Sequence, residues 1–119
     1  MKIAITASGK NLDDPIDNRF GRAKGFLIID NETDECKYQD NIQNLQSTQG
    51  AGIQSAKYIS DAGAHVLITG HVGPKAFKAL TQAGIKIYIG AKGSIKEAIS
   101  DYKSGTLTLA EKADVEGHW

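Results

Sequence analysis

The chain has 119 residues, which is the size of one domain and enough for a hydrophobic core without a disulfide or a structural metal. Lysine plus arginine and aspartate plus glutamate number 14 each, so the net charge is zero and no global field attracts nucleic acid or an acidic membrane. Cys36 is the single cysteine, which excludes an intrachain disulfide or a cage of several thiolates; with no apolar run near the roughly 18 residues of a membrane span, we expect a cytoplasmic protein.

Three strands are predicted in the first third of the chain. Lys2 to Ala7 has apolar or small residues on both faces, which is typical of a central strand. Gly25 to Asp30 is predicted as a second buried strand, and Glu35 to Asp40 alternates in polarity as an edge strand does. On that edge strand Cys36 is expected to be a small buried apolar residue. Residues 8–24, between the first two strands, form a loop long enough to suggest a functional role.

Helices and strands alternate in the rest of the chain. A helix is predicted to follow Gly50, and the segment Ala62–His71 then recurs 21 residues later as Ala83–Lys92. Each copy contains a helix stop, a strand, a glycine turn with one basic residue, and the start of a helix. The last helix begins with a capping box formed by Ser94 and Glu97. We therefore predict one α/β domain over residues 1–107 and a C-terminal tail over residues 108–119.

Three glycine-containing loops are expected to meet at one edge of this sheet. Right-handed crossovers make the later strands parallel to one another and to the first strand, and ligands bind at the carboxyl ends of such strands. The loops at that edge are residues 8–24, 69–73 and 90–93, with the helix start at Gly50–Gly52 nearby. Glycines permit close approach of the backbone, and the free amides of a first helical turn favour an anion. The alternative is an ordinary strand-to-helix turn without a ligand.

The segment from Asp17 to Lys24 has the most unusual composition in the chain. Arg19 and Arg22 are suited to bidentate contacts with an oxyanion, and Phe20 offers an apolar surface between them. Arg22 is expected to point into the cleft. In the alternative, Phe20 anchors the loop in the core and the arginines pair with Asp13, Asp14 or Asp17.

Four segments together resemble the dinitrogenase iron-molybdenum cofactor-binding family. They are Asn18–Ala23, Gly50–Ile53, Gly70–Phe77 and Ala83–Ile85, and the similarity extends from about Met1 to Leu107. The resemblance implies a ribonuclease-H-like α/β fold with a five-stranded mixed sheet in the order 3-2-1-4-5, which agrees with the elements predicted above. The segments Gln49–Gln54 and Gly73–Phe77 are most similar to the orange-protein branch of the family.

The resemblance implies a carrier of a metal-sulfur cluster and not an enzyme. Members bind molybdenum- or iron-containing sulfide clusters, and the orange-protein branch holds a molybdenum–copper sulfide cluster without covalent attachment. Such a cluster is a bulky anion, which main-chain amides, basic side chains and apolar contacts can hold without thiolates. His71 is a candidate metal ligand, with a supporting or structural role as the alternative. The predicted cluster-binding residues are Arg19, Phe20, Gly21, Arg22, Gly50, Gly52, Gly70, His71, Gly73, Lys75, Gly90 and Lys92.

The expected partners follow from this function. They are the cluster itself and an acceptor or ATPase protein, with no nucleic acid and no membrane, and the isolated protein can be in the apo form.

Other functions fit the sequence less well. A nuclease of the ribonuclease-H type needs an acidic residue on the first strand, and residues 2–7 contain none. A phosphate or nucleotide binder would use the glycine turns, but Gly73-Pro74-Lys75 lacks the spacing of a phosphate-binding loop. A protein-interaction module in which no cluster is bound is the third alternative.

Overall fold

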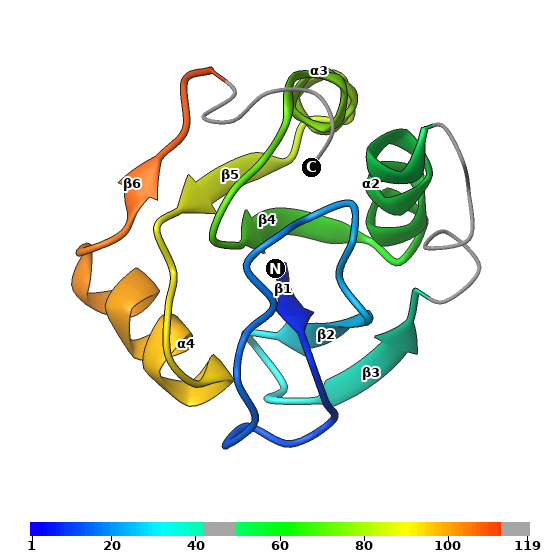
Figure 1. Ribbon diagram of the computed structural model, residues 1–119. Helices are drawn as coiled ribbons and strands as arrows, with labels where there is room; N and C mark the ends of the chain where they lie inside the picture. The colour runs from blue at the N-terminus through cyan, green and yellow to red at the C-terminus, as the bar shows by residue number, and fades with distance from the viewer. Residues whose placement is uncertain (42–49, 113–119) are drawn as a thin grey trace.

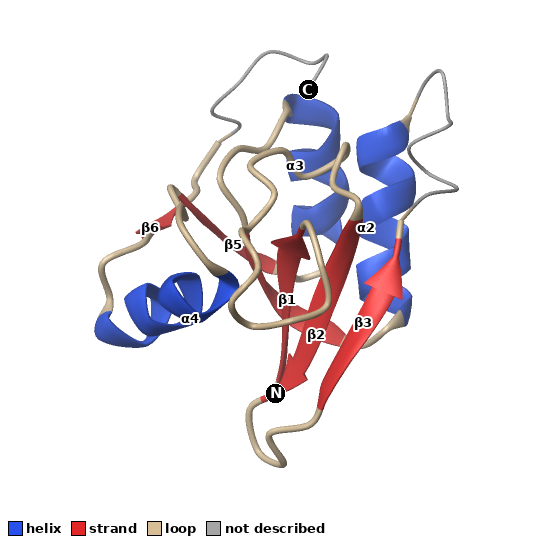
Figure 2. Cartoon of the chain, turned by 60° about the horizontal axis from the view of Figure 1, so that its bottom comes forward, coloured by secondary structure: helices blue, strands red, loops and turns tan. Residues whose placement is uncertain are grey.

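A mixed β-sheet runs through the centre of the fold, with two helices on one face and one helix on the other (Figures 1 and 2). The computed structural model describes residues 1–41 and 50–112. In chain order the elements are β1 (Lys2–Ala7), β2 (Gly25–Asp30), β3 (Cys36–Asp40), α2 (Ala51–Asp61), β4 (Ala64–Ile68), α3 (Pro74–Gln82), β5 (Lys86–Ile89), α4 (Ile95–Ser104) and β6 (Thr108–Leu109). No helix in this part of the chain has the length and apolar character that crossing a membrane requires.

The strand order is β3-β2-β1-β4-β5-β6. β1 is parallel to β4 and β4 to β5, whereas β2, β3 and β6 each run antiparallel to their neighbours. The predicted order 3-2-1-4-5 is therefore confirmed, but the expected number of five strands is wrong. The sixth strand, β6, lies within the segment predicted as a tail, and it pairs Leu109 with Tyr88. Two residues are too few to produce a recognisable alternation in the sequence.

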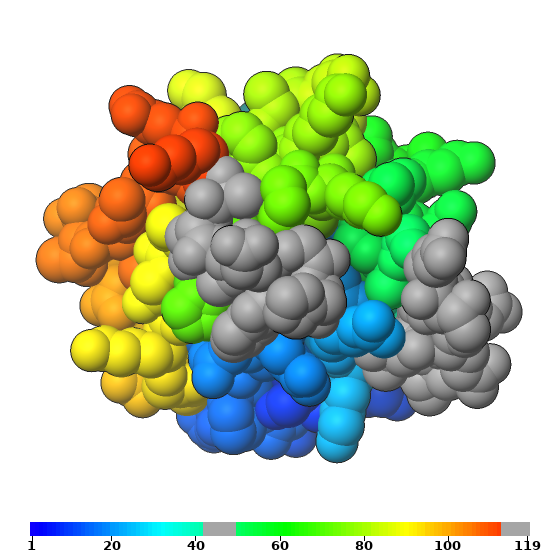
Figure 3. Space-filling model, turned by 45° about the horizontal axis from the view of Figure 1, so that its top comes forward, coloured from blue at the N-terminus to red at the C-terminus, as the bar shows by residue number. Residues whose placement is uncertain are grey.

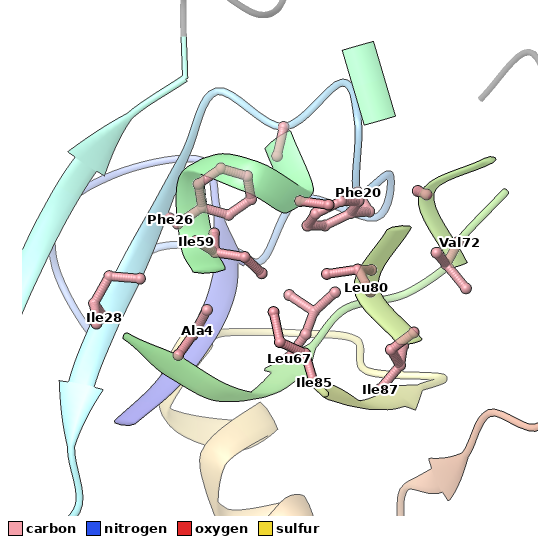
Figure 4. Packing of buried hydrophobic residues seen from close by; sticks show 14 residues of the cluster. Ala4, Phe20, Phe26, Ile28, Ile59, Leu67, Val72, Leu80, Ile85 and Ile87 are labelled. Atoms are coloured by element: carbon pink, nitrogen blue, oxygen red, sulfur yellow. The ribbon is translucent and has the colours of Figure 1, made fainter. Parts of the chain in front are cut away.

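Two hydrophobic cores form because β1 is buried on both faces. Ala4 belongs to the core under α2 and α3, and Ile3 and Ile5 belong to the core under α4. Figure 4 shows the first of these cores, in which Phe20 from the loop lies among side chains of the sheet and of both helices. Its ring centroid is 5.6 Å from that of Phe26 on β2. Phe20 thus fastens the 8–24 loop to the domain.

The expected burial of Cys36 is wrong. The residue is exposed, because β3 is the outermost strand and Cys36 opens into a depression at the amino end of β1 that Lys2 and Ala62 also line. Partial desolvation nevertheless raises the pKa of its thiol. The only sulfhydryl of the chain therefore lies at the end of the sheet opposite to the loops predicted to bind a ligand.

Candidate ligand-binding site

The structure brings the three predicted loops together at the carboxyl ends of β1, β4 and β5. Isolated bridges join Ala7 to Ile16, Pro15 to Ser94 and Arg19 to His71, so the 8–24 loop lies across both later turns. Figure 3 shows the blue 8–24 region beside the yellow region that leads into α4. The loops form one continuous surface and not separate patches.

Arg19 and His71 are held side by side by a short parallel pairing of two loops. The His71 amide donates to the Asn18 carbonyl at 2.8 Å, and the Phe20 amide donates to the His71 carbonyl at 3.2 Å. Gly70 permits this approach, because a Cβ there would lie 2.8 Å from the Asn18 carbonyl oxygen. Contact between two stretches of backbone is therefore sufficient reason for a glycine at position 70.

Two buried threonines support this pairing from below. Thr6 at the end of β1 and Thr69 after β4 are fully buried, and their hydroxyl oxygens are 3.1 Å apart. The Thr6 hydroxyl donates to the Asp17 carbonyl at 2.6 Å, and the Asp17 amide donates to the Thr6 carbonyl at 3.1 Å. These contacts fix the segment that carries Arg19. Sequence reasoning missed both threonines, although each is a polar residue at the carboxyl end of an apolar strand.

The surface is hollowed at two adjoining places. The first depression, of about 440 Å³, is lined by Ser8, Ile16, Asp17, Asn18, Arg19 and His71, and we call it the Arg19–His71 depression. The second, of about 360 Å³, is lined by Asp13, Pro15, Ile16, Asn18, Lys92, Gly93 and Ser94. Because Ile16 and Asn18 line both, the two depressions are neighbours. Each contains one carboxylate beside its basic residues, so the site is not uniformly positive.

Three other predicted residues take structural positions, and a fourth lies outside both depressions. Phe20 is only 1% exposed and cannot line a pocket. The alternative interpretation, in which Phe20 anchors the loop in the core, is confirmed. A Cβ on Gly21 would lie 2.9 Å from the backbone of Gly52, and a Cβ on Gly52 would lie 2.9 Å from Cβ of Ala76. These two glycines allow the loop, α2 and α3 to pack closely. Arg22, which was expected to point into the cleft, is half-buried and lines neither depression.

The starts of α2 and α3 lie next to each other and carry no side-chain cap. Gly50 and Gly73 are their N-caps, and the contact between Gly52 and Ala76 joins the first turns of the two helices. Lys75 is exposed in the first turn of α3. Uncapped first turns present amide donors and the positive end of the helix dipole.

The start of α4 has no such free donors. Its capping box is confirmed: the Glu97 amide donates to the Ser94 hydroxyl at 3.1 Å, and the Ser94 amide donates to the Glu97 carboxylate at 3.3 Å. The amides of Ile95 and Lys96 donate to carbonyls of the 8–24 loop. In the preceding turn the Gly90 amide donates to the Gly70 carbonyl. Of the donors predicted in this region, the exposed Lys92 side chain is the one that remains available to a ligand.

The basic residues of the site are not neutralised by carboxylates of the described chain. Within residues 1–41 and 50–112 the one ion pair joins the Met1 amino group to Glu32, at 3.6 Å. The alternative in which Arg19 or Arg22 pairs with Asp13, Asp14 or Asp17 is therefore wrong. No cluster of three or more histidine, cysteine, aspartate or glutamate side chains suited to a metal ion occurs in the same residues. His71 shares the Arg19–His71 depression with one carboxylate, that of Asp17.

The fold and this surface together are those of a small α/β domain whose candidate ligand contacts are basic side chains and loop backbone. The chain belongs to the dinitrogenase iron-molybdenum cofactor family, whose model matches residues 1–105. It is 35% identical over 118 residues to an uncharacterised protein of Methanocaldococcus jannaschii, covering 93% of this chain and 92% of the relative.

Two solved structures are similar over nearly the whole chain. The apo form of the orange protein from Desulfovibrio gigas superimposes with a TM-score of 0.93 at 41% identity, covering 96% of each chain. A candidate NifB protein from Thermotoga, solved by NMR, superimposes with a TM-score of 0.85 at 31% identity, covering 98% of each chain. Family and neighbours together favour a binding or carrier role related to the iron-molybdenum cofactor over a catalytic one.

Proposed function

We propose that this protein carries an anionic metal-sulfur cluster, of molybdenum with iron or copper, without covalent attachment. The observation that carries the proposal is the pairing of Arg19 with His71 around a depression of about 440 Å³ from which the only cysteine is absent. A sulfide cluster is large, polarisable and negatively charged, so hydrogen-bond donors and cationic side chains can hold it without a cage of thiolates. Membership of the cofactor family supports the same cargo.

The roles of the individual residues follow from their positions. The Arg19 guanidinium supplies charge and several donors, and Lys92 adds charge in the neighbouring depression. His71 is the candidate for a direct metal contact. Ile16, which lines both depressions, supplies apolar contact to the soft sulfide surface. The carboxylates of Asp17 and Asp13 repel negative charge on a bound cluster. They therefore favour a cluster whose charge is spread over many atoms.

The function is tested by adding tetrathiomolybdate and copper to the apo protein. We expect charge-transfer absorption that co-elutes with the protein on gel filtration. Cys36→Ser should leave the absorption unchanged, because Cys36 lies at the other end of the sheet. Arg19→Ala combined with Lys92→Ala should weaken binding about tenfold, since each exposed charge contributes of order 1 kcal/mol or less. Absence of colour with molybdenum- and iron-sulfur sources alike would count against a cluster carrier.

A phosphate or nucleotide is the second candidate ligand. The starts of α2 and α3 have no side-chain cap, and free amides at a helix start favour an anion. Such a ligand would bind only the native state and would raise the melting temperature. Melting curves that do not move with nucleotides, together with co-elution of the cluster, would favour the carrier. Stabilisation by nucleotides without co-elution would favour the phosphate binder.

A further inference from the structure

The outer surface of the α2–α3 pair differs in charge from the neutral chain as a whole. Both helices cover the same face of the sheet and lie side by side (Figures 1 and 2). Lys57 on α2 and Lys75 and Lys78 on α3 are exposed. The two helices contain one carboxylate, Asp61, which is the last residue of α2 and so lies at the end away from the ligand-binding site.

The absence of acidic residues extends well beyond α3. Between Asp61 and Glu97 the chain has lysines at 75, 78, 86, 92 and 96 and no aspartate or glutamate at all. The balancing carboxylates are concentrated elsewhere, with Asp30, Glu32, Asp34 and Glu35 around the β2–β3 turn at the opposite end of the sheet. The lysines of this stretch therefore have no carboxylate near them in the sequence to balance their charge.

The basic face also carries an exposed aliphatic residue. Ile53 lies in the first turn of α2 and is 44% exposed, although the neighbouring Gly52 packs against Ala76 of α3. Lys57 is one helical turn further along, on the same side of α2 as Ile53. A protein–protein interface commonly has an apolar centre and a polar, solvent-accessible rim, and here Ile53 would supply the centre and the lysines the rim. We call the surface formed by Ile53, Lys57, Lys75 and Lys78 the α2–α3 face.

We propose that the α2–α3 face docks an acidic protein surface that offers an apolar contact to Ile53. The partner is a protein and not a nucleic acid because neither helix carries an arginine, and the exposed apolar residue is aliphatic. Bidentate phosphate contacts and base stacking, on which nucleic-acid binders rely, are therefore missing from this face. The inference goes beyond the cargo proposed above, although the face borders the same helix starts, so a docked partner would lie beside the site.

The test uses apo protein and therefore does not depend on cluster binding. A glutamate-rich peptide that contains leucine is titrated into the ¹⁵N-labelled protein, first at low and then at physiological ionic strength. We expect amide shifts confined to residues 53–57 and 75–78, and weaker binding at the higher salt because exposed charges are screened over about 10 Å at 0.1 M. Shifts spread over lysines throughout the chain would overturn the proposal. So would a stronger response of the same amides to a single-stranded DNA of equal length.

Charge-reversal variants provide the matched comparison. Lys75→Glu with Lys78→Glu should weaken peptide binding about tenfold, whereas Lys37→Glu with Lys103→Glu changes the net charge equally but lies off the face and should change binding little. Equal weakening by both pairs would mean that net charge alone attracts the peptide and would overturn the proposal. Ile53→Asn should weaken binding without changing its salt dependence. Far-UV circular dichroism checks that each variant is folded.

Discussion

The loop pairing beside Arg19 depends on the absence of a side chain at position 70, and Gly70→Ala tests this directly. A Cβ at this position would lie 2.8 Å from the Asn18 carbonyl oxygen and 3.0 Å from Asn18 Cα, and both are backbone atoms. The Asn18 backbone cannot move away easily, because it accepts from the His71 amide at 2.8 Å and because Phe20, two residues on, is buried in the core. The φ angle of Gly70 is not positive, so the expected effect is steric and not one of backbone strain.

The magnitude follows from two opposing terms. Overpacking of this kind costs about 1–3 kcal/mol, and the loss of conformational freedom in the unfolded chain offsets about 0.4–1 kcal/mol, which leaves a destabilisation of about 1–2 kcal/mol. In a domain of this size that corresponds to roughly 3–6 °C in melting temperature for each kcal/mol. Urea denaturation followed by far-UV circular dichroism measures the free energy, and cluster co-elution measures the effect on the site.

Gly84→Ala is the control for Gly70→Ala. Gly84 has φ +79° with open space where a Cβ would be, so alanine there costs about 1–2 kcal/mol through its left-handed conformation alone. Because Gly84 follows α3 at the other end of the molecule, this variant should lose similar stability but keep full cluster binding. Wild-type stability and wild-type binding in Gly70→Ala would refute the account of the loop pairing.

Two further predictions concern polar contacts outside the depressions. Asn41→Ala should destabilise the fold by about 1–3 kcal/mol, because the buried Asn41 amide donates to the Ala23 carbonyl at 2.9 Å and the loss leaves that carbonyl unsatisfied; an unchanged urea midpoint would contradict this. Asp30 accepts from the Glu32 amide at 2.9 Å, which together with the nearby N-terminus and Lys2 holds its pKa below the ordinary value of 3.8. Its stabilising contribution is therefore present above pH 3.8 and is lost as the pH falls through the native pKa, so the stability advantage of the wild type over Asp30→Asn should shrink in acid. A constant difference across that pH range would show that Asp30 does not act through its charge.

The architecture could be predicted because its signals are local. β1 and β2 have the predicted bounds, since continuous apolar runs flanked by glycine and polar residues identify buried strands. The repeat at an offset of 21 residues located β4, β5 and the turns after them. Ser94 and Glu97 could be recognised as a cap because a capping box is defined by sequence spacing alone.

The site could be predicted only in outline. That the loops meet follows from topology, but which side chains face outward depends on contacts between residues far apart in the chain. Phe20 was placed in the site because it stands between two arginines, whereas the structure uses it as a core anchor. Gly21, Gly52 and Gly70 serve backbone packing, and a glycine in a sequence does not reveal whether a ligand or another strand of backbone approaches it. The Thr6–Thr69 contact joins residues that are 63 positions apart, and no local pattern in the sequence predicts it.

The position of Cys36 bears on how the protein can be handled. Because the lone sulfhydryl opens into a depression at the far end of the sheet, a maleimide dye or a solid support can be attached there without obstructing the loops around Arg19 and His71. The raised pKa of the thiol means that this coupling should proceed faster as the buffer is made more alkaline. Binding and release of the proposed cluster could then be followed on a tethered molecule in real time, with the Arg19–His71 depression facing the solution.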